Sequence, residues 1–129
     1  MQRRRLGTAL GEEVGGRIVA TASIIASYPP EGSAVYAATK ASVRLMTEVL
    51  SLELVPRGVT VNSLDPGPVE GAGIFTQMKD DLRRSFYEKT PLGRLPRAQD
   101  LVGALAFLLS DEAAMVSGHH LAVKGAFRI

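Results

Sequence analysis

Short apolar runs bounded by glycine, proline and small polar residues recur along the chain and predict strands. The first run, GRIVATAS, contains the β-branched neighbours Ile18 and Val19, and the second begins by alternating Val59 and Val61 with polar residues. Such runs are typical of buried strands rather than of long helices. The three predicted strands span residues 16–23, 59–64 and 118–123.

The longest helical pattern lies between the first two predicted strands. From residue 34 to residue 54, apolar side chains recur three and four positions apart, as they do along one face of a helix. Ser33 is the expected N-cap, and a proline and a glycine just beyond the pattern end it. A further helix is predicted over residues 100–110. Residues 71–90 carry an amphipathic stripe on a charged background, which predicts a mobile, partly helical insertion that either caps a substrate pocket or simply packs.

The order of these elements is strand, helix, strand, helices, strand. The connections between successive strands are long enough for the strands to run parallel. We therefore expect an α/β fold, with residues 1–129 forming a single domain.

Composition narrows the possible chemistry. The chain has no cysteine, which excludes a disulfide framework, a thiolate zinc site and a cysteine nucleophile. Charged residues make up 22% of the chain and the formal net charge is +2, so no nucleic-acid partner is expected, and the basic cluster at residues 3–5 is interpreted as a solvated helix face. His119 and His120 are adjacent and would point to opposite faces of a strand, so no metal site is expected.

The chain shows no sign of membrane association or secretion. No apolar run reaches the length needed to span a bilayer, and the basic N-terminal residues are not followed by the apolar segment of a signal peptide. We therefore expect a cytoplasmic location and no contact with membranes.

Tyr36 and Lys40 are four residues apart, which places one above the other on one face of the predicted helix. Taken alone, the pair is weak evidence, because many such pairs only pack and solvate. Ser23 closes the first predicted strand, and the loop DPGPV follows the second. Since small-molecule sites in parallel sheets lie at the carboxyl ends of the strands, these features converge on one candidate site.

This set of side chains suits carbonyl chemistry. A phenol is a poor acid or base near neutral pH, but an ammonium group one helical turn away favours the phenolate form, and Lys40 is placed to do this for Tyr36. The hydroxyl of Ser23 would bond the substrate oxygen while Tyr36 gives or takes the proton. Hydride transfer would be left to a cofactor, because no side chain performs it.

Five segments match, in order and spacing, the second half of one enzyme family. They are GGRIVATAS, YAATKAS, GVTVNSLDPGPV, PLGRL and FLLSDEAAMVSGHHLAV. On these segments the chain resembles the short-chain dehydrogenase/reductase family, from Gly15 nearly to its last residue.

The resemblance implies a partial Rossmann-type fold of three layers, with about three parallel strands flanked by helices. It also implies that Ser23 orients the substrate, that Tyr36 is the general acid/base, and that Lys40 binds the nicotinamide ribose while tuning Tyr36. The implied cofactor is NAD or NADP, and the implied substrate is a small-molecule carbonyl or alcohol. The residues implied to line the nicotinamide site are Pro66, Gly67 and Val69.

The first half of that family has no counterpart here. Family members begin with a strand and the motif T-G-x-x-x-G-x-G, whereas the nearest string in this chain, GTALGEE, has Glu13 in place of the last glycine. The N-terminal dinucleotide-binding half is therefore expected to be missing, and the isolated chain to be weakly active or inactive. Gly71 stands where the family has a threonine that contacts the cofactor, and Lys124 reverses a charge near the last strand.

Without that half, the first strand is expected to expose an unpaired edge, which favours association with another chain. One interpretation is an oxidoreductase of this family with a Ser23, Tyr36 and Lys40 site. The alternative is a truncated, non-catalytic chain that acts as an oligomerisation or interaction module, with a homo-oligomer formed through the helix at 34–54. A third interpretation is that another chain supplies the missing half.

Overall fold

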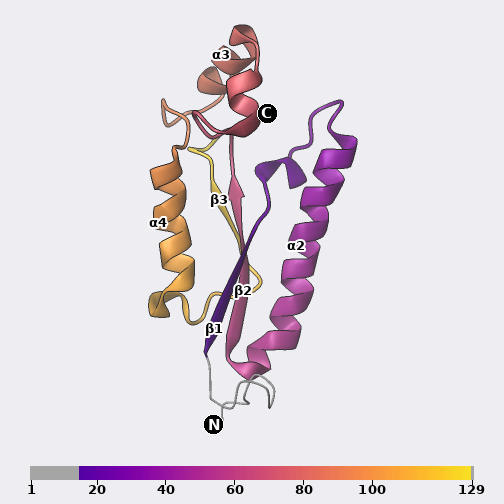
Figure 1. The fold of residues 1–129 in the computed structure, drawn as a ribbon, viewed down its shortest axis with the longest axis vertical. Coiled ribbons are helices and arrows are strands. Elements are labelled where there is room, and N and C mark those ends of the chain that lie inside the picture. The colour runs from indigo at the N-terminus through magenta and orange to yellow at the C-terminus, as the bar shows by residue number, and fades with distance from the viewer. Residues whose placement is uncertain (1–14, 129) are drawn as a thin grey trace.

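The computed structural model describes residues 15–128, which contain a three-stranded parallel sheet (Figure 1). The strands lie side by side in the order β1, β2, β3. Their bounds are Gly16–Thr21 for β1, Val59–Pro66 for β2 and His120–Val123 for β3. The predicted α/β class and the parallel direction of the strands are confirmed.

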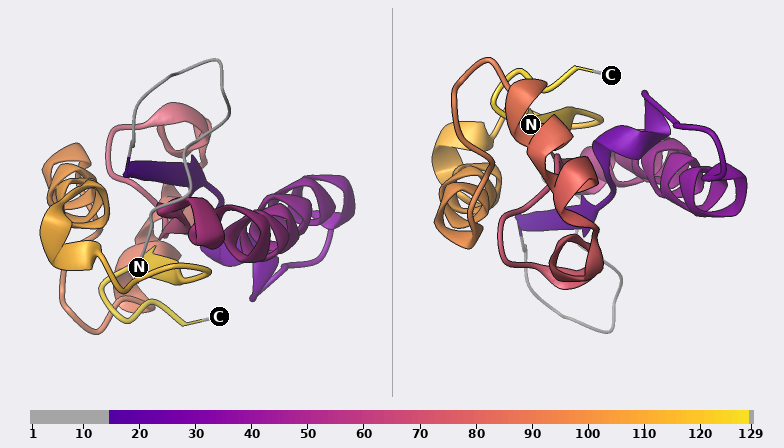
Figure 2. Two further views of the ribbon diagram at one scale, coloured as in Figure 1. Left: turned by 90° about the horizontal axis from the view of Figure 1, so that it is seen from below. Right: turned by 90° about the horizontal axis from the view of Figure 1, so that it is seen from above.

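Helices cover both faces of the sheet and complete three layers (Figures 1 and 2). Helix α2 (Ala34–Leu54) packs mainly on β2, and α4 (Ala98–Leu109) lies on the other face against all three strands. Helix α3 (Asp80–Glu88) lies beyond the carboxyl ends of the strands, at the top of Figure 1. Short 3₁₀ helices are η1 (Ile24–Ala26), η2 (Val55–Arg57), η3 (Gly73–Gln77) and η4 (Asp111–Ala113). Within residues 15–128, no helix is both long and apolar enough to cross a membrane.

The strand ends differ from the predicted ends by a few residues. Strand β1 ends at Thr21 because Ser23 turns away to cap η1. Strand β2 continues through Pro66 because its last residues still pair with β3. Both shifts lie at the carboxyl ends of the strands, where local pattern alone does not show how far pairing continues.

Strand β2 is the centre of the core. Every residue from Val59 to Asp65 is buried, because β2 has a strand on each side and a helix over each face. Leu95 and Leu108, which are completely buried, close the core on the side of α4. Strand β1 is an edge strand of this sheet, and its Ile18 side chain is 43% exposed.

Helix α2 has the predicted bounds, but it packs on the sheet through small side chains. Ala37, Thr47 and Ser51 are its buried residues. Small side chains let the helix lie close to the strands, whereas the large apolar residues that carry the helical pattern point away from the sheet. Those with the largest exposure are Val35, Leu45, Met46, Val49 and Leu52.

The residue before α2 does not cap it as predicted. Ser33 occupies the N-cap position, but its hydroxyl donates to the carbonyl of Pro30 at 2.6 Å and makes no bond to the first turn. Ser33 therefore stabilises the preceding loop rather than the helix terminus.

The predicted insertion is partly helical, and its aromatic residues pack. Phe75 is 6% exposed, and its ring centroid lies 6.4 Å from that of Phe86. Phe86 in turn lies 5.6 Å from Phe127 of the C-terminal tail. These contacts favour packing over an open lid for this part of the segment.

We expect Gly67→Ala to destabilise the protein by about 1–3 kcal/mol, the usual cost of overpacking. An added Cβ would lie 2.9 Å from the Cβ and 3.1 Å from the Cα of Lys124. Gly103→Ala is the matched control, because a Cβ in that part of α4 meets no atom within 4 Å and alanine favours the helix by about 1 kcal/mol. Urea unfolding of both variants measures the difference. A Gly67→Ala chain as stable as the unmodified chain would contradict the tight approach of Gly67 to Lys124.

Candidate functional site

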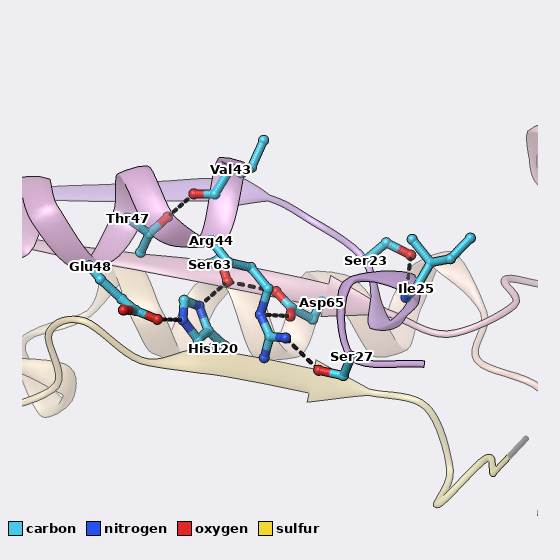
Figure 3. Close-up of polar contacts among 10 residues, drawn as sticks. All are labelled: Ser23, Ile25, Ser27, Val43, Arg44, Thr47, Glu48, Ser63, Asp65 and His120. Atoms are coloured by element: carbon cyan, nitrogen blue, oxygen red, sulfur yellow. Dashed lines mark hydrogen bonds and ion pairs between the residues drawn. The ribbon is translucent and has the colours of Figure 1, made fainter. Parts of the chain in front are cut away.

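Ser23 lies in the turn between β1 and η1, at the carboxyl end of the sheet. The N–H of Ala22 donates to the carbonyl of Leu64 at 2.9 Å, which holds this turn against β2. The hydroxyl oxygen of Ser23 accepts the N–H of Ile25 at 3.2 Å and caps η1 (Figure 3). Because that bond uses a lone pair of the oxygen, the hydroxyl proton of Ser23 is free for another acceptor.

Tyr36 and Lys40 lie together on the first two turns of α2. The Lys40 ammonium nitrogen is 5.9 Å from the centroid of the Tyr36 ring. The same nitrogen donates to the carbonyl of Thr21 at 3.2 Å, the last residue of β1. Lys40 therefore joins the start of α2 to the strand that leads to Ser23, while the Tyr36 side chain remains 51% exposed.

The structure brings Tyr36 and Lys40 into contact, but it does not bond Ser23 to either of them. Among the described residues, the hydroxyl of Ser23 has no partner other than the N–H of Ile25. All three side chains are nevertheless carried by the segments that meet at the carboxyl end of β1.

The loop implied to line the nicotinamide site begins where β2 ends. Pro66 pairs with Val123, and the N–H of Gly67 donates to the Val123 carbonyl at 2.9 Å. Val69 is half-buried, and its carbonyl accepts the N–H of Ala72 at 3.3 Å. This loop and the carboxyl end of β1 thus lie at the same end of the sheet, as the parallel topology predicts.

Glu70 ties this loop to both of the following helices, a role that the sequence did not reveal. Its carboxylate accepts the Tyr87 hydroxyl at 3.1 Å and the Arg97 Nε–H at 3.0 Å. The bond from Arg97 is the larger cause and the bond from Tyr87 the second, and together they hold the pKa of Glu70 below its usual value. Desolvation, followed by the bond to Glu70, raises the pKa of Tyr87. Glu70 therefore connects the loop after Gly67 to α3 and to the start of α4.

Asp100 fastens the same region at the start of α4. The guanidinium of Arg94 donates to both of its carboxylate oxygens, at 2.7 and 2.8 Å, and the N–H of Arg97 donates at 2.8 Å. The bond from Arg94, followed by that from the Arg97 backbone, holds the pKa of Asp100 well below its usual range. The polar start of this helix is visible in the sequence, but its partner Arg94 is not.

The two histidines differ in their contacts. The backbone N–H of His119 donates to Asn62 Oδ1 at 3.0 Å, whereas the ring of His120 contacts Ser63 and Glu48 (Figure 3). Over residues 15–128, no group of three or more metal-ligating side chains gathers. The strings at residues 3–5 and 7–13 lie outside the described residues.

Comparison with known proteins places these features in a family. A family model described as enoyl-(acyl carrier protein) reductase matches residues 4–127. The 3-oxoacyl-[acyl-carrier-protein] reductase FabG of Escherichia coli (strain K12) is 39% identical over 110 residues, which are 85% of this chain and 45% of that protein. The uncharacterized oxidoreductase YjdA of Bacillus subtilis (strain 168) is 38% identical over 114 residues, covering 88% of this chain and 44% of that protein.

A solved structure agrees with these matches. It is a 7 alpha-hydroxysteroid dehydrogenase complexed with NADH and 7-oxo glycochenodeoxycholic acid, with a TM-score of 0.83 and 27% sequence identity. The similarity covers 88% of this chain and 45% of that one. This chain therefore spans less than half the length of the relatives that it matches.

We expect acid to destabilise the chain, and Asp100→Asn to remove part of this dependence. Because the folded-state pKa of Asp100 lies below its ordinary 3.8, the stabilisation is complete above about pH 4 and is lost progressively as the pH falls further. The asparagine variant should be less stable at neutral pH and should lose less below about pH 4. Thermal unfolding across this range measures both effects.

Asp81→Asn is the control, because Asp81 is exposed on α3 and has no ion pair among the described residues. Parallel pH curves for the unmodified chain and the Asp100→Asn chain would contradict the assignment.

Proposed function

Because this chain belongs to the short-chain dehydrogenase/reductase family, we propose that it carries the Ser-Tyr-Lys part of an NAD(P)-dependent oxidoreductase site. The reaction is reduction of a small-molecule carbonyl or oxidation of an alcohol. The observation that carries the proposal is the position of Lys40, whose ammonium group contacts both the Tyr36 ring and the last carbonyl of β1. A phenol and an ammonium group are thereby held together at the carboxyl end of a parallel sheet.

Tyr36 is the general acid/base in this proposal. Its side chain is half-exposed, so its hydroxyl can reach a bound substrate and exchange a proton with it. The ammonium of Lys40 stabilises the phenolate form that remains after proton donation. Ser23 donates its free hydroxyl proton to the same substrate oxygen and so fixes the direction of the carbonyl.

The residues present also fit a nicotinamide nucleotide. Lys40 has three N–H donors and uses one of them on Thr21, which leaves donors for the hydroxyls of a ribose. Pro66, Gly67 and Val69 would line the nicotinamide at the end of β2. The cofactor, when bound, supplies or accepts the hydride that no side chain can transfer.

Catalysis by the isolated chain is expected to be weak or absent. The chain covers 45% of the reductase from E. coli, so more than half of that protein has no counterpart here. The glycine-rich phosphate loop of the family is likewise not found between residues 15 and 128. The test therefore needs a context in which the rest of the fold is present.

We expect a chimera, in which residues 15–128 replace the matching half of the E. coli reductase, to reduce that enzyme's 3-oxoacyl substrate. In this chimera Tyr36→Phe should lower kcat by about 10²–10⁴-fold, the usual contribution of a positioned acid/base. Spectrophotometric assay of NADPH and NADH oxidation measures the loss. The isolated chain, titrated with each nucleotide in a thermal-unfolding assay, should show no rise in Tm.

Tyr28→Phe is the matched control, because the Tyr28 hydroxyl makes no hydrogen bond among the described residues and its ring still faces the Lys124 ammonium at 4.6 Å. An active chimera whose rate is unchanged by Tyr36→Phe would overturn the catalytic assignment. A nucleotide-dependent rise in Tm of the isolated chain would overturn the expectation that it does not bind the cofactor alone.

We also infer a role in association, which the outward face of α2 favours. Leu45, Val49 and Leu52 are 63%, 46% and 79% exposed on successive turns of that helix. A run of exposed apolar side chains on one helix face is typical of an interface. A second copy of the same helix would cover it, which gives a homo-oligomer through residues 34–54.

We expect the chain to form a dimer in size-exclusion chromatography with light scattering, and the double variant Leu45→Glu, Leu52→Glu to be monomeric. The charged side chains would have to lose their water in the interface, which costs more than the contact returns. Met115→Glu is the control, because Met115 is 96% exposed and lies outside α2. A monomer before substitution, or a dimer retained after it, would contradict association through α2.

A further inference from the structure

A chain of polar side chains runs between α2 and the sheet and ends at Ser27, the C-cap of the short helix η1 that Ser23 caps at its start (Figure 3). It begins on α2, passes the first residue of β3 and the carboxyl half of β2, and returns to α2 before it reaches η1. Its members in order are Glu48, His120, Ser63, Asp65, Arg44 and Ser27.

The centre of this chain is buried and charged. Ser63 is completely buried and donates its hydroxyl proton to Asp65 Oδ1 at 2.6 Å. The Asp65 side chain is 2% exposed, and its other oxygen lies 2.9 Å from Arg44 Nε in an ion pair. The Nε–H is not directed at that oxygen, so the contact is electrostatic rather than a hydrogen bond. A buried carboxylate needs such a partner, because an unpaired charge in the interior is strongly destabilising.

The other end of the chain orients Ser63. The Ser63 oxygen also lies 2.8 Å from His120 Nδ1, a contact in which the tautomer of the ring sets the donor. His120 Nε2 lies 2.8 Å from Glu48 Oε1 on α2. A serine, a histidine and a glutamate in sequence suggest a nucleophile, but the complete burial of Ser63 leaves no access for a substrate. These residues therefore support Asp65 and have no hydrolytic role.

Arg44 connects the three segments that carry the proposed site. It lies one helical turn after Lys40 and two turns after Tyr36, on the side of α2 that faces the sheet. Its Nη1 donates to the hydroxyl of Ser27, which is the C-cap of the same short helix that Ser23 caps at its start. Its other partner, Asp65, is followed directly by Pro66 and Gly67.

One guanidinium group can hold these two partners because its Nη1 donates to Ser27 while its charge, on the Nε side, faces the Asp65 carboxylate. A lysine at this position would keep a charge near Asp65, but its compact ammonium group would not span to Ser27 as well.

We propose that Arg44 is a positioning residue, which sets the Ser23 turn and the end of β2 against the helix that carries Tyr36 and Lys40. It touches no reacting atom and acts through Ser27 and Asp65. The proposal rests on the proposed function, because positioning matters only where Ser23 and Tyr36 act on one substrate.

The first test uses the full chain and needs no catalysis. Ser27→Ala removes the partner on η1 and leaves the ion pair with Asp65 intact. We expect the amide N–H of Ile25, which is bonded to Ser23, to exchange about tenfold faster and to shift in ¹⁵N–¹H spectra, while the global Tm stays almost unchanged. Arg44→Lys should reproduce this local effect.

Ser42→Ala is the matched control, because its exposed hydroxyl bonds only to the Thr39 carbonyl on α2. The proposal is overturned if Ser27→Ala and Arg44→Lys change the exchange rate and chemical shift of the Ile25 amide no more than Ser42→Ala does. It is equally overturned if exchange accelerates to the same extent throughout the core, since that result shows general destabilisation only.

The second test uses the chimera and separates positioning from stability. Arg44→Lys is expected to lower kcat about tenfold with little change in KM, because a misplaced hydroxyl weakens the reacting geometry more than it weakens binding. The substitution should have no further effect on kcat in a Tyr36→Phe background. If Tyr36→Phe itself leaves the rate unchanged, the proposed function fails, whereas the exchange result for Ile25 still decides whether Arg44 holds the turn.

Discussion

The complete burial of β2 is the constraint on which the rest of the structure depends. This strand carries polar side chains among its apolar ones, and with neighbours on both edges and both faces their partners must come from the protein itself. Asn62 obtains them from the turn before β3, donating to the Val116 carbonyl at 2.8 Å and accepting from His119. Ser63 and Asp65 obtain them from His120 and from α2. Asn62, Ser63 and Asp65 therefore specify how neighbouring elements approach β2, whereas the buried Thr60 hydroxyl has no hydrogen-bond partner among the described residues.

The same constraint explains the orientation of α2. A helix that must deliver Arg44 to a buried carboxylate cannot also direct its leucines at the sheet, because the two sets lie on different faces. Small residues such as Ala37 and Thr47 fill the remaining inner positions and keep the helix close. The large apolar side chains are consequently left outside, where they form a surface suited to another helix. The orientation of α2 therefore determines both how the helix attaches to the sheet and which side chains it exposes for association.

Local pattern was sufficient for the elements and their order, and for the pairing of Tyr36 with Lys40, because these depend on helical or strand periodicity alone. It was insufficient for the direction in which α2 faces, since its apolar period would direct the leucines inward in an ordinary amphipathic helix. It also did not reveal the pairs Arg44 with Asp65 and Glu70 with Arg97, whose members lie far apart in the chain. The members of such pairs meet only after the chain has folded, so the residue types and their local spacing do not predict which of them pair.

Within residues 15–128, contacts inside the chain place the candidate site. Lys40 is placed by Thr21, Ser23 by Ile25, and the loop after Gly67 by contacts with β3, α3 and α4. In the proposed site, the parallel ladder and its buried polar side chains would hold the acid/base group, a task distinct from binding the phosphates of a cofactor. The sheet, η1 and α2 together set the positions of Ser23, Tyr36 and Lys40.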